Sequence, residues 1–105
     1  MVTFETGKSF CIEDLVKIME LLRSPEGCPW DRVQTHQSIR QNMLEEAYEA
    51  VDAIDHMDMD NLKEELGAVL LQVVFHASMA QEAGQFTFDD GVDGVCQKLL
   101  YRHPH

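Results

Sequence analysis

The segment from about residue 61 to residue 83 constrains the fold more than any other part of the chain. Its apolar side chains are spread around almost the whole circumference of a helix, a pattern typical of a helix that is largely buried. Other helices must cover such a helix, and we expect a homo-oligomer, either a dimer or a dimer of dimers, in which another copy does so. The apolar positions are Leu62, Leu66, Val69, Leu70, Leu71, Val73, Val74, Phe75 and Ala77.

Three further stretches, at about 12–23, 35–57 and 87–102, also space their apolar residues at helical intervals. The second stretch could be broken near 40–42, where the periodicity lapses, and a loop is expected to run through 24–30. Asn61 with Glu64, and Thr87 with Asp90, match the capping box that opens a helix. Gly84 sits where a glycine commonly follows a helix end. The sequence therefore predicts an all-α fold of four uneven helices without strands.

Composition limits the domain count and the partners. The chain has 105 residues, 45% of them hydrophobic, which suits one globular domain over 12–105 after a flexible N-terminal segment, 1–11. Nineteen acids against eight Lys and Arg give a net charge of −11, which argues against binding to nucleic-acid polymers. No apolar run is long enough to span a membrane. Three widely spaced cysteines form no disulfide framework or zinc motif, which favours the reducing cytoplasm.

Acidic residues gather on one face of the second helical stretch. On a helical wheel Glu49 lies about 40° and Glu46 about 100° from Glu45, while the apolar residues take the opposite side. Like charges one turn apart repel each other, so this face is mildly destabilising unless a cation is bound. The alternative is an ordinary solvated acidic face, which the pattern alone does not exclude.

Glu65 favours a bound cation over a solvated acidic face, because it is an acid on the most apolar of the predicted helices. Such an acid rarely stays buried unless it is paired or bound to a metal. Two antiparallel helices carrying Glu46, Glu49 and Glu65 could converge on one hard cation such as Mg²⁺. A di-iron bundle is set aside, because no Glu precedes a His by three residues. His76 is interpreted as a hydrogen-bonded helix histidine rather than a ligand.

Six short blocks of the sequence resemble the blocks of a known protein family. Taken in order, they resemble the MazG nucleotide pyrophosphohydrolases, a branch of the all-α NTP pyrophosphohydrolase superfamily, over roughly 12–105. The blocks are Cys28-Pro29-Trp30-Asp31, Gln34-Thr35-His36, Leu44-Glu45-Glu46-Ala47-Tyr48-Glu49, Glu64-Glu65-Leu66-Gly67, Gln72-Val73-Val74-Phe75 and Arg102-His103-Pro104-His105.

The resemblance implies a four-helix core completed by dimerisation and Mg²⁺-dependent hydrolysis of nucleoside triphosphates to monophosphate and pyrophosphate. Mn²⁺ is expected to substitute for Mg²⁺. The family signature is EExxE followed by ExxD, and Glu45, Glu46, Glu49 and Glu65 match its glutamates. Its closing Asp would fall at position 68, where this chain has Ala68. Losing one carboxylate from a metal site lowers affinity, so activity is expected to be impaired, with Asp52 as a speculative substitute.

Roles follow for the matched residues if the site works. Glu46, Glu49 and Glu65 would hold Mg²⁺ against the phosphates, with Glu45 as a further candidate ligand and as the group that orients or deprotonates the attacking water. Trp30 is expected either to stack on a base or to plug the core. Positive charge for the phosphates could come from four cations, each of which could equally be solvated: Arg32, Arg40, Lys98 and Arg102.

Two other functions remain open. The first is a catalytically inactive copy of the domain that binds nucleotide or serves as a dimerising, regulatory unit, which the Ala68 substitution favours. The second is a helical interaction module with an acidic face, which the near-complete motif series makes the weakest reading. Because a family block stands at the very end of the chain, we also expect it to be a fragment of a longer protein.

Overall fold

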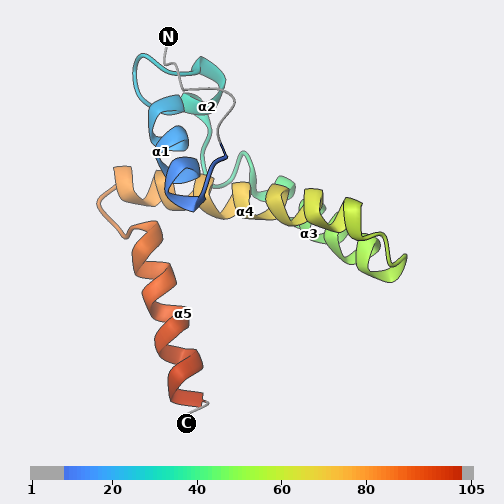
Figure 1. Ribbon diagram of the computed structural model, residues 1–105. Helices are drawn as coiled ribbons and strands as arrows, with labels where there is room; N and C mark the ends of the chain where they lie inside the picture. The colour runs from blue at the N-terminus through green and yellow to red at the C-terminus, as the bar shows by residue number, and fades with distance from the viewer. Residues whose placement is uncertain (1–8, 103–105) are drawn as a thin grey trace.

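A computed structural model describes residues 9–102 of the protein, and that part is built from helices joined by short turns (Figure 1). It contains no strand, so the all-α prediction is confirmed. Residues 1–8 and 103–105 lie outside the described part, and with them most of the expected flexible segment and the end of the last sequence block. The helices are α1 (Ile12–Leu22), α2 (Pro29–Val33), α3 (Arg40–Asp55), α4 (Met59–Glu82) and α5 (Phe88–Arg102).

The arrangement is centred on α4. Figure 1 shows α3 beside the first half of α4, α1 against its second half with α2 next to α1, and α5 leaving its far end to project away from the other helices. Within the described residues no helix is long and apolar enough to cross a membrane.

Two helix boundaries differ from the predicted ones. The α2 helix was expected to be loop, but Pro29 occupies the start of this short helix, where its missing N–H group is not needed. The α4 helix begins before Asn61, because the side chain of Asp58 accepts a hydrogen bond from the Asn61 backbone N–H at 3.2 Å. Asp58 is therefore the N-cap, and the capping box expected at Asn61 is wrong.

Other boundary predictions are confirmed. The Thr87 backbone N–H donates to the Asp90 carboxylate at 2.8 Å, and the Asp90 N–H donates to the Thr87 hydroxyl at 3.1 Å, so the capping box of α5 is complete. Gly84 has a φ of 71°, the left-handed conformation in which glycine ends a helix. The break expected near 40–42 lies just before Arg40, since residues 36–39 form a turn.

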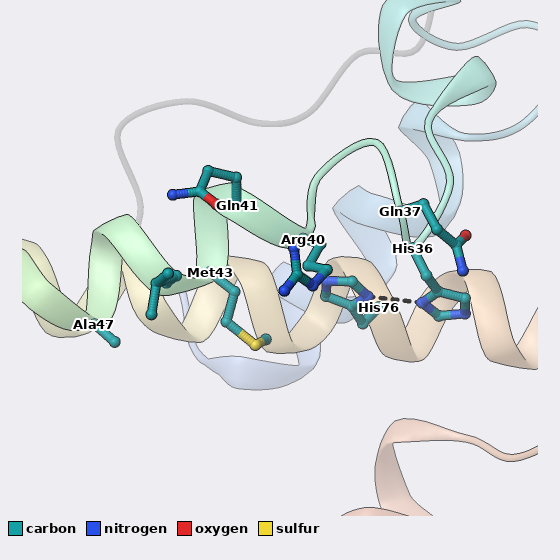
Figure 2. A pocket seen from close by; sticks show the side chains of 8 residues that line it. His36, Gln37, Arg40, Gln41, Met43, Ala47 and His76 are labelled. Atoms are coloured by element: carbon teal, nitrogen blue, oxygen red, sulfur yellow. Dashed lines mark hydrogen bonds between the residues drawn. The ribbon is translucent and has the colours of Figure 1, made fainter.

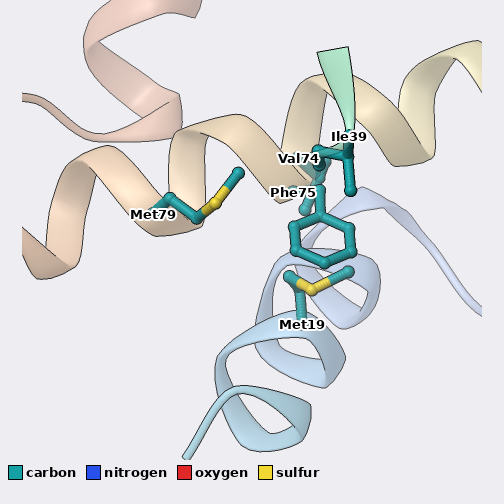
Figure 3. Packing of buried hydrophobic residues seen from close by; sticks show 5 residues of the cluster. All are labelled: Met19, Ile39, Val74, Phe75 and Met79. Atoms are coloured by element: carbon teal, nitrogen blue, oxygen red, sulfur yellow. The ribbon is translucent and has the colours of Figure 1, made fainter. Parts of the chain in front are cut away.

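The core lies where α1 and the turn before α3 meet the second half of α4 (Figure 3). The first half of α4 is not buried within one copy: Leu66 is 54% exposed and Leu70 is 37% exposed. Burial becomes nearly continuous only from Gln72 onward. The buried core side chains are Met19, Ile39, Val74, Phe75 and Met79.

Arg23 links α1, α2 and the end of α4. Its side chain is only 7% exposed and forms a two-pronged ion pair with Glu82, at 2.6 and 2.9 Å. The same guanidinium donates to the backbone oxygens of Asp31 and Gln34 and lies 5.7 Å from the ring centre of Phe75. A single side chain thus fixes the loop that carries α2 against α4.

We predict that Arg23→Ala lowers the free energy of unfolding by about 2–4 kcal/mol, because it leaves two backbone carbonyls and Glu82 without their donor. Urea denaturation followed by circular dichroism measures this change. Lys17→Ala, at an exposed position of α1, is the matched control and should stay within about 0.5 kcal/mol of the parent protein. Equal effects of the two substitutions would contradict the role assigned to Arg23.

Candidate functional site

The acids of α3 divide into two groups according to their burial. Ala50 and Ala53 are buried and mark the side of α3 that packs on α4. Glu46 lies near this side and is half-buried, whereas Glu45 and Glu49 are exposed. The helical periodicity therefore points Glu46 towards α4, with Glu49 one turn further along the same edge.

Glu65 of α4 faces these acids. Desolvation raises the pKa of Glu65 above its ordinary value, and a hydrogen bond with the side chain of Glu46 raises it further. The negative charges of Glu46, Glu49 and Glu64 act in the same direction on this pKa. Two carboxylates can approach each other in this way only with a proton or a cation between them. We call Glu46, Glu49 and Glu65 together the carboxylate groove, a name for these three side chains and not for a cavity.

The chemistry of the carboxylate groove fits a hard divalent cation. Within residues 9–102 none of its three acids forms an ion pair with Lys, Arg or His, so its negative charge is uncompensated. Mg²⁺ takes a few carboxylate oxygens and keeps several waters, so it does not require a closed cage. In the same residues no group of three acid, His or Cys side chains is gathered closely enough to hold an ion as it stands. The groove thus supplies suitable donors but not a preformed cage.

Ala68 and Asp52 are the two positions relevant to the fourth carboxylate that the family signature predicts. Ala68 lies one turn after Glu65 and is half-buried, so the place of the expected fourth carboxylate is occupied by a methyl group. The carboxylate of Asp52, the expected substitute, lies 3.4 Å from the Nδ1 atom of His56, near the end of α3. The pKa of His56 is raised by a bond to the Asp52 backbone oxygen and then by the Asp52 charge.

Glu45 lies apart from the contact between Glu46 and Glu65. It lines a separate hollow of about 330 Å³ on the outer side of α3, which also includes Glu49 and Tyr48. Its charge does not contribute to the raised pKa of Glu65. Glu45 therefore lies beside the carboxylate groove rather than within it.

Two of the expected substrate-binding residues lie on α2. Trp30 is 57% exposed and meets Phe75 edge to face, with ring centres 6.4 Å apart, so it covers the core without being enclosed by it. Arg32 donates a hydrogen bond to the Pro25 backbone oxygen and thereby closes its own loop. Phe75 is ten residues after Glu65, about 15 Å along the helix axis, so α2 does not border the carboxylate groove.

The remaining cations are also separated from the groove. Lys98 and Arg102 are exposed on α5, which starts beyond the end of α4 and projects away (Figure 1). From Glu65 to Glu82 the axis of α4 rises by about 26 Å, so the structure does not bring these cations to the groove within one copy. Arg40 is nearer, at the start of α3, where it lines a cavity together with His36 and His76 (Figure 2).

Sequence reasoning missed the partner of His76. Its Nδ1 atom lies 2.7 Å from the Nδ1 atom of His36, which confirms the interpretation of His76 as a hydrogen-bonded histidine. The only sequence signal was a polar side chain on an apolar stripe, and nothing in the spacing indicated that a residue forty positions earlier would meet it. The three cysteines are free thiols, as expected.

Comparison with known proteins shows that the chain is similar to one family of nucleotide pyrophosphohydrolases. Residues 34–105 match the MazG nucleotide pyrophosphohydrolase domain. The chain is 58% identical to the nucleoside triphosphate pyrophosphohydrolase/pyrophosphatase MazG of Thermotoga maritima, over 89% of this chain and 36% of that protein. It is 53% identical to the nucleoside triphosphate pyrophosphohydrolase of Escherichia coli K12, over 90% of this chain and 36% of that protein. The chain thus spans about a third of the length of these two relatives.

Proposed function

The chain belongs to the MazG nucleotide pyrophosphohydrolase family, and we propose that it hydrolyses nucleoside triphosphates to monophosphate and pyrophosphate with Mg²⁺, for which Mn²⁺ can substitute. The observation that carries this proposal is the approach of Glu65 to Glu46 and Glu49, which have no cationic partner among residues 9–102. An acidic site of this kind suits a polyanionic substrate only when a metal ion lies between them. The free cysteines favour a cytoplasmic setting, which is part of the proposal.

Each of the four glutamates has a role in the proposed hydrolysis. Glu46, Glu49 and Glu65 would hold Mg²⁺, which offsets the charge of the phosphates. Glu45, beside the groove, would take a proton from the attacking water. The water oxygen bonds to the α-phosphorus, and the bond from that phosphorus to the oxygen bridging to the β-phosphate breaks, releasing pyrophosphate. Arg40 is the cation nearest to this arrangement among those predicted to meet the phosphates.

A second copy of the chain is part of the proposal, because one copy leaves much apolar surface uncovered. We predict a particle of at least twice the mass of one chain by light scattering at micromolar concentration, since a homo-oligomer would cover these side chains. A monomer throughout that range would contradict the prediction. The large exposed apolar residues of α3, α4 and α5 are Leu44, Tyr48, Val51, Ile54, Met59, Leu66, Leu70, Leu71, Val73, Val92, Val95, Leu99, Leu100 and Tyr101.

Ala68 supports one alternative, a copy of the domain that binds nucleotide without hydrolysing it. The test incubates the protein with a panel of common and modified triphosphates plus Mg²⁺ or Mn²⁺, and measures both pyrophosphate and monophosphate. Stoichiometric release of the two products supports the proposed reaction. Metal-dependent nucleotide binding without products supports the inactive copy. The absence of both would reject every nucleotide function, leaving the helical interaction module.

A further inference from the structure

One hollow described in the structure lies apart from the carboxylate groove. It is a cavity of about 490 Å³ between the turn before α3, the first turns of α3 and the middle of α4 (Figure 2). His36 and His76 meet at its wall, and Arg40 is the only other ionisable side chain among the described residues that line it. A volume of this size is within the usual range for small-molecule sites.

The two imidazole rings meet edge to edge. Their planes are within 7° of each other and their centres are 5.0 Å apart, while the two Nδ1 atoms approach to 2.7 Å. Rings stacked face to face could not bring two nitrogens so close, so the rings extend one another in a common plane. One Nδ1 atom must then donate a proton and the other must accept it, because two N–H groups or two lone pairs would repel at this distance.

Burial decides which nitrogen carries the proton. The Nε2 atom of His76 is buried and has no hydrogen-bond partner, and an N–H group there would be an unpaired donor. The Nδ1–H of His76 therefore donates to Nδ1 of His36, and His36 carries its own proton on Nε2. Desolvation, and then the proximity of His36, lowers the pKa of His76, which favours its neutral form. The two rings thus form a planar wall.

The rest of the described lining combines apolar side chains with two amide side chains. Met43 and Ala47 form part of the apolar lining, and the amide side chains of Gln37 and Gln41 can each donate and accept hydrogen bonds. A phosphate would need more cations than Arg40 alone, and a metal ion would need acids, which this lining lacks. A flat aromatic heterocycle fits, because its faces are apolar and its edges carry donors and acceptors.

The cavity adjoins the acids of α3. Gln41 and Leu44 line both this cavity and the hollow that contains Glu45 and Glu49. A nucleotide whose phosphates lie at the carboxylates can therefore place its base in the cavity without leaving the surface of α3. We infer that this cavity receives the base of the nucleoside triphosphate and that the His36–His76 pair sets the preference among bases. The inference rests on the proposed function for its substrate.

Ala47→Met tests the cavity without altering the histidine pair, because it adds bulk from an exposed position of α3. We expect the KM for purine triphosphates to rise by about tenfold while kcat changes little, since base binding alone is obstructed. Tripolyphosphate, which lacks a base, should inhibit the variant and the parent protein with equal Ki. Ala83→Met, outside the cavity, is the matched control and should leave KM unchanged. An equal loss for tripolyphosphate, or an unchanged KM, would overturn the inference.

Substitutions at His36 test the preference among bases. His36→Leu removes the acceptor for His76, whereas His36→Asn keeps an acceptor at the same place. We expect the ratios of kcat/KM among the four common bases to change by about fivefold or more in the Leu variant and to return towards the parent values in the Asn variant. Unchanged ratios in the Leu variant would contradict the role of the pair.

A binding measurement separates this inference from the proposed hydrolysis. Adenosine, guanosine, cytidine and uridine, which carry no phosphate, are added to the parent protein while the imidazole signals are followed by NMR. We expect at least one nucleoside to shift the signals of His36 and His76 and to leave the exposed His56 unchanged. This result without triphosphate hydrolysis would reject the proposed reaction and keep the cavity assignment. Hydrolysis with no shift for any nucleoside would reject the cavity assignment alone.

Discussion

Replacing Ala68 with Asp is expected to raise the Mg²⁺-dependent rate of pyrophosphate release from nucleoside triphosphates by about tenfold or more. Position 68 lies one turn after Glu65 on α4 and is half-buried, so a carboxylate there would join Glu46, Glu49 and Glu65. Even a change in the surroundings of metal ligands alters affinity or activity by about 10- to 100-fold, and a ligand itself should matter at least as much. The parent chain should show weak or no turnover.

Gly67→Asp is the matched control for this substitution. It adds the same charge one residue earlier, about 160° around the helix from Glu65, and a Cβ atom there meets nothing within 4 Å. Its rate should equal that of the parent protein. An equal gain in both variants would mean that overall charge is responsible. Full activity of the parent chain, unchanged by Ala68→Asp, would show that position 68 is not needed as a ligand.

Glu65→Gln is expected to have opposite effects on activity and on stability. Turnover, measured in the Ala68→Asp background where the rate is high enough, should fall by about 100-fold, because Gln removes the charge that α4 contributes to the cation. Without divalent cations, however, the same substitution in the parent chain should raise the melting temperature at pH 7. The ionised Glu65 carboxylate is held against Glu46 and Glu49, and Gln relieves that repulsion.

The raised pKa of Glu65 determines how the free energy of unfolding changes with pH. The pKa of Glu65 is raised in the folded protein, so the folded state keeps a proton over a pH interval in which the unfolded chain has lost it. The free energy of unfolding then falls as the pH rises through that interval. The stabilising effect of Glu65→Gln should therefore be complete above the folded pKa and vanish below the ordinary value of 4.5. Thermal melts across this range measure it, with exposed Glu26→Gln as a control that changes little.

The helices were predictable because their signals are local. The apolar spacing gave α1, α3, α4 and α5 to within a few residues, and the reciprocal bonds of Thr87 and Asp90 confirm one cap directly. The start of α4 was wrong because Asp58 competed with Asn61 as the N-cap, and both residue types favour that position. The α2 helix was missed because five residues that include a proline carry too little periodicity to be recognised.

The candidate site was predictable only in part. The acids of α3 and α4 face each other because two antiparallel helices with polar stripes leave few other arrangements, and this placement of Glu46 and Glu65 agrees with the raised pKa of Glu65. The direction in which α5 leaves α4 depends on the turn at 83–87 rather than on the pattern within α5. The separation of Lys98 from the groove therefore could not be inferred. The meeting of His36 with His76 depends on the conformation of the turn before α3 and was equally out of reach.

Mn²⁺ binding to the parent chain and to Glu65→Gln, followed by water proton relaxation, tests whether a cation binds at the carboxylate groove without depending on turnover. We expect the parent chain to bind Mn²⁺, Mg²⁺ to displace it, and Glu65→Gln to weaken the binding by about tenfold or more. Equal affinity of the two proteins for Mn²⁺, or no binding by the parent chain at millimolar Mn²⁺, would contradict the assignment of a cation to the carboxylate groove.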